Sequence, residues 1–135
     1  MGLNRNRALG LTALRITIAC LLAIHGWYRF TQGGVGPFGE WLTSQGIPFG
    51  TYVAGAVTAF EILATPLLAL GWRAPWLCLG FAPIYAAGLV MVHWPEGWFV
   101  VGGGRNGMEY SVLLLACLGV IAFTHLPERA IVEEV

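Results

Sequence analysis

The sequence contains no lysine and no aspartate, and charged residues make up only 10% of its 135 residues. A soluble domain is about one quarter charged, whereas here apolar residues reach 57%. The formal net charge is zero and basic residues form no runs, so nothing in the composition suggests a nucleic-acid partner. These shortages indicate a membrane protein with short loops, surrounded by membrane lipid.

Cysteine is also scarce in this chain. Cys20, Cys78 and Cys117 each lie inside an apolar run, and no C-x-x-C pair occurs. This absence removes the usual signature of a dithiol redox centre. We expect all three cysteines to be small buried apolar side chains.

Four long apolar segments predict four membrane spans, at about residues 8–30, 52–71, 75–94 and 108–126. The expected fold class is all-α, a transmembrane four-helix bundle in a single domain. Between spans one and two, residues 37–45 place Phe38, Trp41 and Leu42 at helical spacing, which predicts a short amphipathic helix in the membrane interface. Residues 1–7 are similar to the charged region of a signal peptide. No small-residue cleavage site follows them, so we expect an uncleaved spanning helix.

The arginines predict how the spans are oriented. Four lie on the side of the termini and two on the other, namely Arg5, Arg7, Arg73 and Arg129 against Arg29 and Arg105. The positive-inside rule then places both termini in the cytoplasm, with the chain in a bacterial-type inner (plasma) membrane. In that orientation four polar residues lie at or near the outer ends of their spans, namely His25, Arg29, His93 and Glu109.

Glu61 lies in the middle of span two, where an unpaired carboxylate is costly. Such a group takes up a proton or finds a cation, and span one offers two arginines. Arg15 lies deeper than Arg29, so depth along the sequence does not choose between them. Arg29 shares a helix face with His25, four residues earlier. Glu61 is then either half of a buried pair that fixes helix packing, or a proton-handling group that lines a cavity.

His25 and His93 end spans one and three at similar outer depths. Two chemistries fit this pair. The histidines could orient and protonate a quinone, with Tyr28, Trp94 and Tyr110 as an aromatic wall. Alternatively, they could ligate a haem between two helices. A third interpretation is that they only form hydrogen bonds with loops and lipid headgroups.

Several stretches of the chain resemble the DoxX-like family of membrane proteins. They are LRI at 14–16, HGWYRF at 25–30, FGEWLTSQGIP at 38–48, AFE at 59–61, MVHWPEGWF at 91–99 and GMEYSVLLL at 107–115. The resemblance implies a four-helix inner-membrane protein. Some members are linked to thiosulfate:quinone oxidoreduction, and others to membrane complexes that respond to oxidative or thiol stress. It also implies signature positions at Arg15, His25, Glu61, His93, Glu109 and Tyr110. Many members place lysine after the HG pair, and here Arg29 supplies that charge.

The sequence therefore predicts a quinone-linked oxidoreductase subunit with an outward-opening polar pocket. The expected catalytic residues are His25, Glu61, His93 and Glu109. The expected substrate- or quinone-binding residues are Arg29, Tyr28, Trp94, Tyr110 and Arg15. In this hypothesis His25 and Glu61 exchange protons, while Arg29 holds an anionic substrate or a quinone oxygen.

We expect no metal and no covalently bound cofactor, with quinone as the possible ligand. The expected partners are other subunits of a membrane complex or further copies of this chain. The competing class is a non-catalytic accessory or assembly subunit whose buried polar groups only fix helix packing.

Overall fold

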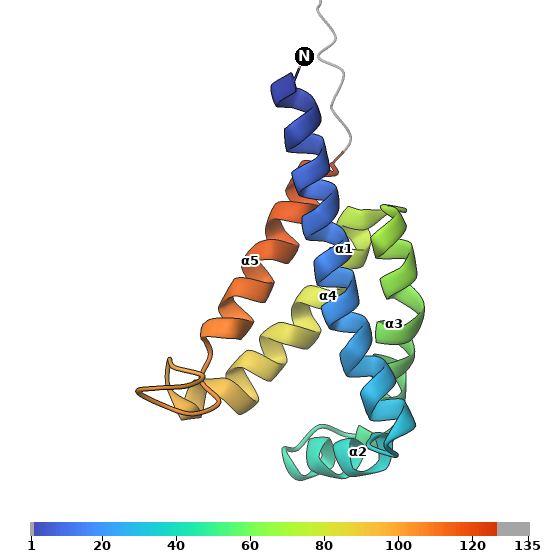
Figure 1. The fold of residues 1–135 in the computed structure, drawn as a ribbon. Helices are drawn as coiled ribbons and strands as arrows, with labels where there is room; N and C mark the ends of the chain where they lie inside the picture. Colours follow the sequence, from blue (N-terminus) through green and yellow to red (C-terminus); the bar gives the residue numbers. More distant parts are fainter. Residues whose placement is uncertain (1, 127–135) are drawn as a thin grey trace, which may run out of the picture.

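A computed structural model describes residues 2–126, and these residues fold into helices joined by turns and one longer loop (Figure 1). The elements in chain order are α1 (Gly2–Thr31), α2 (Val35–Ser44), α3 (Gly50–Leu70), α4 (Ala74–Gly88), the π-helical turn η1 (Leu89–His93), the 3₁₀ turn η2 (Trp94–Glu96) and α5 (Glu109–Thr124). The predicted all-α fold is confirmed in this part of the chain. Arg129, which contributed to the predicted orientation, lies outside the described residues.

Three of the helical segments are long and apolar enough to cross a membrane, namely Asn4–Thr31, Gly50–Leu70 and Ala74–Glu96. The fourth predicted span is a shorter apolar helix, α5, of 16 residues. At 1.5 Å per residue α5 is about 24 Å long, against about 30 Å for the hydrocarbon core of a bilayer. The predicted helix between spans one and two is present as α2.

The helices pack as two pairs. α1 lies along α3, and α4 lies along α5, while α2 packs against α3. The two pairs meet where α5 ends and α3 turns into α4, and the first turns of α1 project beyond this end (Figure 1). We call it the termini end. The pairs diverge toward the opposite end, where α2 crosses below α1 and α3 and the loop after η2 returns to α5. We call this second end the loop end.

The buried apolar core lies in the half of the molecule nearer the termini end. Its members are Ile18, Ala19, Leu22, Ala64, Leu68, Ala74, Cys78, Phe81, Leu114, Leu118 and Ile121. Cys78 is buried as expected, and Cys117 is half-buried, but Cys20 is exposed on the outer surface of α1. The expectation that all three cysteines are buried is therefore wrong for Cys20. This core does not extend to the loop end, where hydrogen bonds and an ion pair join the helices instead.

Two prolines and one π-helical turn interrupt the regular helices. Pro66 lies inside α3 and Pro83 inside α4, and each removes a backbone donor from its helix. α4 continues into the π-helical turn η1, which ends at His93. π-helical turns are frequent at functional sites because they re-aim the side chains that follow. Here the turn sets the position of His93.

Gly26 allows α1 and α3 to approach each other closely. A Cβ atom at this position would lie 2.7 Å from the Cβ of Glu61 and 3.1 Å from the Cγ1 of Ile62. No side-chain atom other than hydrogen therefore fits at residue 26 without moving α3. The missing side chain is what brings Glu61 against the surface of α1.

We predict that Gly26→Ala destabilises the protein by about 1–3 kcal/mol, the usual cost of overpacking. Gly10→Ala is the matched control, because a Cβ at Gly10 in the same helix meets nothing within 4 Å. Alanine also stabilises a helix interior by up to about 1 kcal/mol relative to glycine. Thermal unfolding in detergent measures both variants. Equal stability of the two would contradict the close approach of α1 and α3 at Gly26.

Candidate functional site

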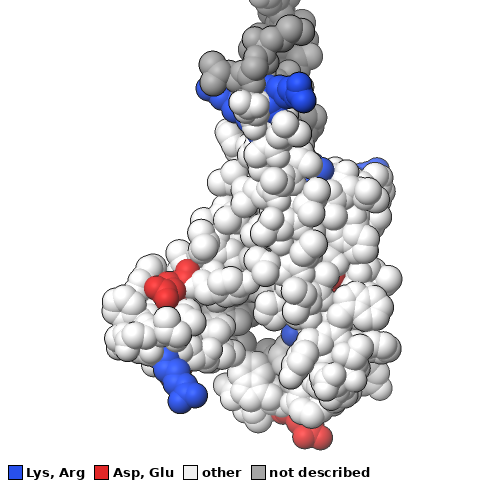
Figure 2. All heavy atoms as spheres, viewed as in Figure 1, with Lys and Arg blue, Asp and Glu red and all other residues white. Residues whose placement is uncertain are grey.

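A cavity of about 490 Å³ lies at the loop end, between the α1–α3 pair with α2 and the diverging ends of α4 and α5. Figure 2 shows the molecular surface hollowed between these two groups of elements. Each α-helix contributes to the lining. The polar and aromatic residues that line the cavity are His25, Arg29, Phe38, Trp41, Glu61, Tyr85, His93, Tyr110 and Ser111. Aliphatic side chains from α2, α3, α4 and η1 complete the walls.

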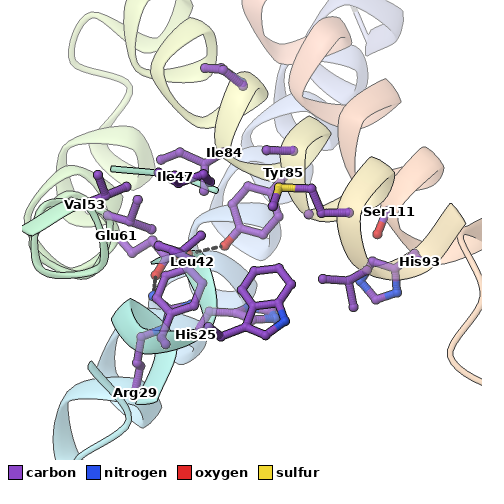
Figure 3. Close-up of a pocket in the computed structure, with 18 of the residues that line it drawn as sticks. His25, Arg29, Leu42, Ile47, Val53, Glu61, Ile84, Tyr85, His93 and Ser111 are labelled. Atoms are coloured by element: carbon purple, nitrogen blue, oxygen red, sulfur yellow. Dashed lines mark hydrogen bonds and ion pairs between the residues drawn. The ribbon is translucent and has the colours of Figure 1, made fainter. Parts of the chain in front are cut away.

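An ion pair stands at one wall of this cavity (Figure 3). Arg29 Nη1 donates to Glu61 Oε2 at 2.6 Å. The Tyr85 hydroxyl donates to the other carboxylate oxygen, Oε1, at 2.8 Å. Glu61 is only 1% exposed, and both of its oxygens have a donor. The buried carboxylate of Glu61 in α3 therefore joins α1, through Arg29, to α4, through Tyr85. Of the two arginines that the sequence left open, Arg29 is the one that pairs with Glu61.

Arg29 is held in place by two further contacts. Its Nη1 also donates to the Thr58 hydroxyl at 3.2 Å, and Thr58 in turn donates to the Ala54 carbonyl at 2.7 Å. The guanidinium carbon lies 4.5 Å from the centre of the Phe38 ring in α2. A cation over an aromatic ring is attracted by the ring quadrupole. Arg29 thus fastens α2 to the same group.

Both histidines at the loop end line the cavity. His25 Nδ1 lies 2.9 Å from the Leu21 carbonyl oxygen, one turn earlier in α1. The His25 ring stands edge-on to the Tyr85 ring, with 5.9 Å between the ring centroids. His93 Nδ1 lies 2.9 Å from the Asn106 carbonyl oxygen in the loop that precedes α5. In each case a backbone carbonyl fixes the orientation of the imidazole.

Several residues expected in the pocket lie elsewhere. Tyr28 and Trp94 do not line the cavity, and they are 69% and 63% exposed. Glu109 also faces away, because its Oε1 accepts a hydrogen bond from the Val100 backbone N–H at 3.0 Å. The prediction that Tyr28, Trp94 and Tyr110 form an aromatic wall is therefore wrong for Tyr28 and Trp94. Tyr110 lines the cavity, and Phe38 and Trp41 of α2 take the other positions.

Arg15 lies at the termini end, far from the cavity along α1. Its Nε donates to the Ala69 carbonyl at 3.3 Å, and its Nη1 lies 2.6 Å from His125 Nε2. Ala69 is in the last turn of α3, where backbone carbonyls lack helical partners and a cation is favoured. Arg15 therefore closes the termini end and does not contribute to the cavity.

Tyr85 is a site residue that was not predicted from the sequence. The sequence does contain a feature that points to Tyr85. Its hydroxyl lies within an apolar span, and a buried hydroxyl needs a hydrogen-bond partner. A search for donors to the carboxylate of Glu61 would have found it. No sequence pattern identified its depth, which depends on how α4 lies against α3.

The charges of the cavity wall cancel. Arg29 and Glu61 are its one cation and one carboxylate among the described lining residues, and they contact each other directly. A ligand in the cavity therefore meets no net charge from arginine or carboxylate side chains. It meets hydrogen-bonding groups on a predominantly apolar wall, which suits a neutral amphiphile better than an anion.

We predict that Arg29→Met destabilises the protein by about 3–5 kcal/mol, because it leaves a buried carboxylate without its cation. Glu61→Gln added to Arg29→Met should recover most of that loss. The neutral amide still accepts the hydrogen bond from Tyr85, and no unpaired charge remains. Arg105→Met is the control, since Arg105 is exposed in the loop before α5. Unfolding in detergent gives the double-mutant cycle, and a strictly additive double variant would argue against the ion pair.

Comparison with known proteins gives one family match. The model of the family described as DoxX matches residues 10–94, which is more than half of the chain. The matched range contains His25, Arg29, Glu61, Tyr85 and His93, whereas the part of the cavity built by α5 lies beyond it. No curated protein and no solved structure gives a significant match.

Proposed function

Because the chain belongs to the DoxX family of membrane proteins, we propose that its cavity binds a membrane quinone. In this proposal the chain is the quinone-linked subunit of an oxidoreductase concerned with thiosulfate, thiols or oxidative stress. The observation that carries the proposal is the cavity itself, in which a buried polar group shares one apolar, aromatic-lined space with two histidines.

The size and lining of the cavity support a ring-sized amphiphile. Small-molecule sites commonly measure about 300–1,000 Å³, with mainly apolar walls and a few placed polar groups. The volume of about 490 Å³ falls in that range. Phe38, Trp41 and Tyr110 provide aromatic surface for a flat ring. The cavity opens between diverging helices, so a lipid-soluble tail has a path into the surrounding membrane.

The cancelled charge favours a quinone over an anionic substrate in this cavity. Thiosulfate would lose its hydration and gain no net positive charge, since Arg29 is already neutralised by Glu61 at 2.6 Å. A quinone ring is neutral and needs only hydrogen bonds at its oxygens. We therefore assign thiosulfate or thiol chemistry to a partner subunit, whose electrons reduce the quinone bound in this cavity.

The chain's own residues supply binding, orientation and proton handling in this proposal. Arg29, Glu61 and Tyr85 form the fixed polar wall, and the aromatic side chains hold the ring. Of the proton-exchanging pair expected from the sequence, Glu61 has a donor at each oxygen, so in this proposal His25 and His93 exchange protons with the ligand. With both termini in the cytoplasm, as the arginine distribution predicts, the cavity opens toward the outer face of the membrane.

A non-catalytic accessory role is the second candidate, and one observation favours it. Glu61 receives a donor at each oxygen, and Arg29 is also held by Thr58 and Phe38. A group satisfied in this way can serve only to lock three helices together. The two candidates differ in whether the cavity takes a ligand.

A direct binding measurement tests the proposal. We expect a benzoquinone with a short alkyl tail to bind the purified chain in lipid nanodiscs. Ala87→Trp should weaken this binding by about tenfold or more, because Ala87 lines the cavity and a large side chain there fills it. Leu79→Trp is the matched control, since Leu79 lies on the same helix, is exposed and does not line the cavity.

Two results would overturn the quinone proposal. One is no measurable binding to the wild-type chain, which would leave the accessory role. The other is an equal loss of binding in Ala87→Trp and Leu79→Trp, which would place the ligand on the lipid-facing surface instead of in the cavity. A reduced-minus-oxidised absorption spectrum of the same sample tests the haem alternative.

A further inference from the structure

The three histidines of the chain share one hydrogen-bonding pattern. In each, Nδ1 lies 2.9 Å from a backbone carbonyl oxygen, namely Leu21 O for His25, Asn106 O for His93 and Ile121 O for His125. A carbonyl oxygen only accepts hydrogen bonds, so Nδ1 carries the hydrogen in all three rings. In the neutral imidazole the other nitrogen, Nε2, then presents a lone pair.

The three lone pairs differ in their partners. His125 Nε2 faces Arg15 Nη1 at 2.6 Å, so its lone pair receives a donor from within the chain. His25 Nε2 and His93 Nε2 receive no donor from residues 2–126, and both rings line the cavity. Two residues of the cavity lining thus carry an Nε2 acceptor that the described part of the chain leaves without a donor.

The remaining polar groups of the wall do not supply those donors. The Tyr85 hydroxyl uses its one hydrogen on Glu61 Oε1, so it offers a ligand only an acceptor. The indole N–H of Trp41 and the unused N–H groups of Arg29 can donate to an oxygen of a ligand in any redox state. Neither these groups nor the hydroxyls of Tyr110 and Ser111, which can donate or accept, discriminate between a carbonyl and a hydroxyl. Discrimination rests on the two imidazoles.

We propose that the cavity selects a ligand that carries two hydroxyl hydrogens, and thus binds the hydroquinone in preference to the quinone. This inference rests on the proposed function, because it names the redox state bound at that same site. A hydroxyl donates to an imidazole Nε2 and still accepts from Arg29 or Trp41. A quinone carbonyl can only accept hydrogen bonds. Its oxygen lone pairs would face the Nε2 lone pairs of the histidines, and the two Nε2 atoms would remain without a donor.

The experiment compares the two redox states of one ligand. A benzoquinone with a short alkyl tail and its hydroquinone are titrated against the wild-type chain in phosphatidylcholine nanodiscs. The buffer is mildly alkaline and oxygen-free, so that imidazole is neutral and the hydroquinone stays reduced. We expect the hydroquinone to bind about tenfold more tightly or better, since sites built to pair with a hydroxyl reject ligands that lack it.

Three histidine variants separate the inference from a general effect on folding. His25→Gln and His93→Gln should each bring the ratio of the two dissociation constants closer to one, because a side-chain amide can present either an N–H or a carbonyl. His125→Gln is the matched control and should leave the ratio unchanged, since His125 already has Arg15 as its donor at the termini end.

The outcomes distinguish this inference from the proposed function. Equal affinity for the two forms, or tighter binding of the quinone, overturns the redox preference and leaves the quinone site standing. A failure of both forms to bind overturns the proposed function and the inference together.

A lipid glycerol headgroup also carries two hydroxyls, so phosphatidylglycerol is added to the nanodiscs as a separate arm. Retention of that lipid by the wild-type chain and its loss in His25→Gln and His93→Gln, without a preference for the hydroquinone, would assign the donors to a headgroup. That result overturns the proposal. An unchanged preference with and without phosphatidylglycerol supports it.

Discussion

The buried carboxylate of Glu61 is the constraint on which the loop end of this protein depends. A charge at this depth costs several kcal/mol unless it is paired and hydrogen-bonded. Arg29 and Tyr85 meet that requirement from two different helices, at 2.6 and 2.8 Å. To bring them there, α1, α3 and α4 must keep one relative position. Gly26 is part of the same constraint, because only a residue without a Cβ admits Glu61 to the surface of α1.

The two ends of the molecule are held by different forces. At the termini end, close packing of Leu22, Leu68, Phe81 and their neighbours fills the space between α1, α3, α4 and α5. In lipid, such packing replaces the hydrophobic effect as the source of helix association. At the loop end that packing stops, and polar contacts join the helices. Polar contacts fix positions without filling volume, and this is why a cavity can persist beside them.

The sequence predicted the helices better than it predicted the site. Long apolar runs determine spans in a membrane, because only helices satisfy the backbone there, and α2 followed from the spacing of its apolar residues. The sequence could not show which arginine pairs with Glu61, because Arg15 lies deeper in the membrane than Glu61 and Arg29 lies shallower. The choice depends on how α1 packs against α3. Tyr28 and Arg29 lie on either side of His25 around α1, three and four residues after it, so helical phase alone did not show that Tyr28 lies outside the cavity. Trp94 and Glu109 lie where regular helix ends, and there phase no longer predicts direction.

Because Arg29 and Glu61 neutralise each other, the proposed site would recognise a ligand by hydrogen bonds and shape instead of by charge. An unpaired charge within the membrane would be costly, and the pairing of Arg29 with Glu61 removes that cost from the cavity wall. The same pairing removes electrostatic attraction as a means of selection. What remains is the pattern of hydrogen-bond donors and acceptors, and the backbone carbonyls of Leu21 and Asn106 set that pattern by fixing the imidazole tautomers. In the proposed site, recognition therefore depends on main-chain geometry near the ends of α1 and η1, and not on the charged pair in the cavity wall.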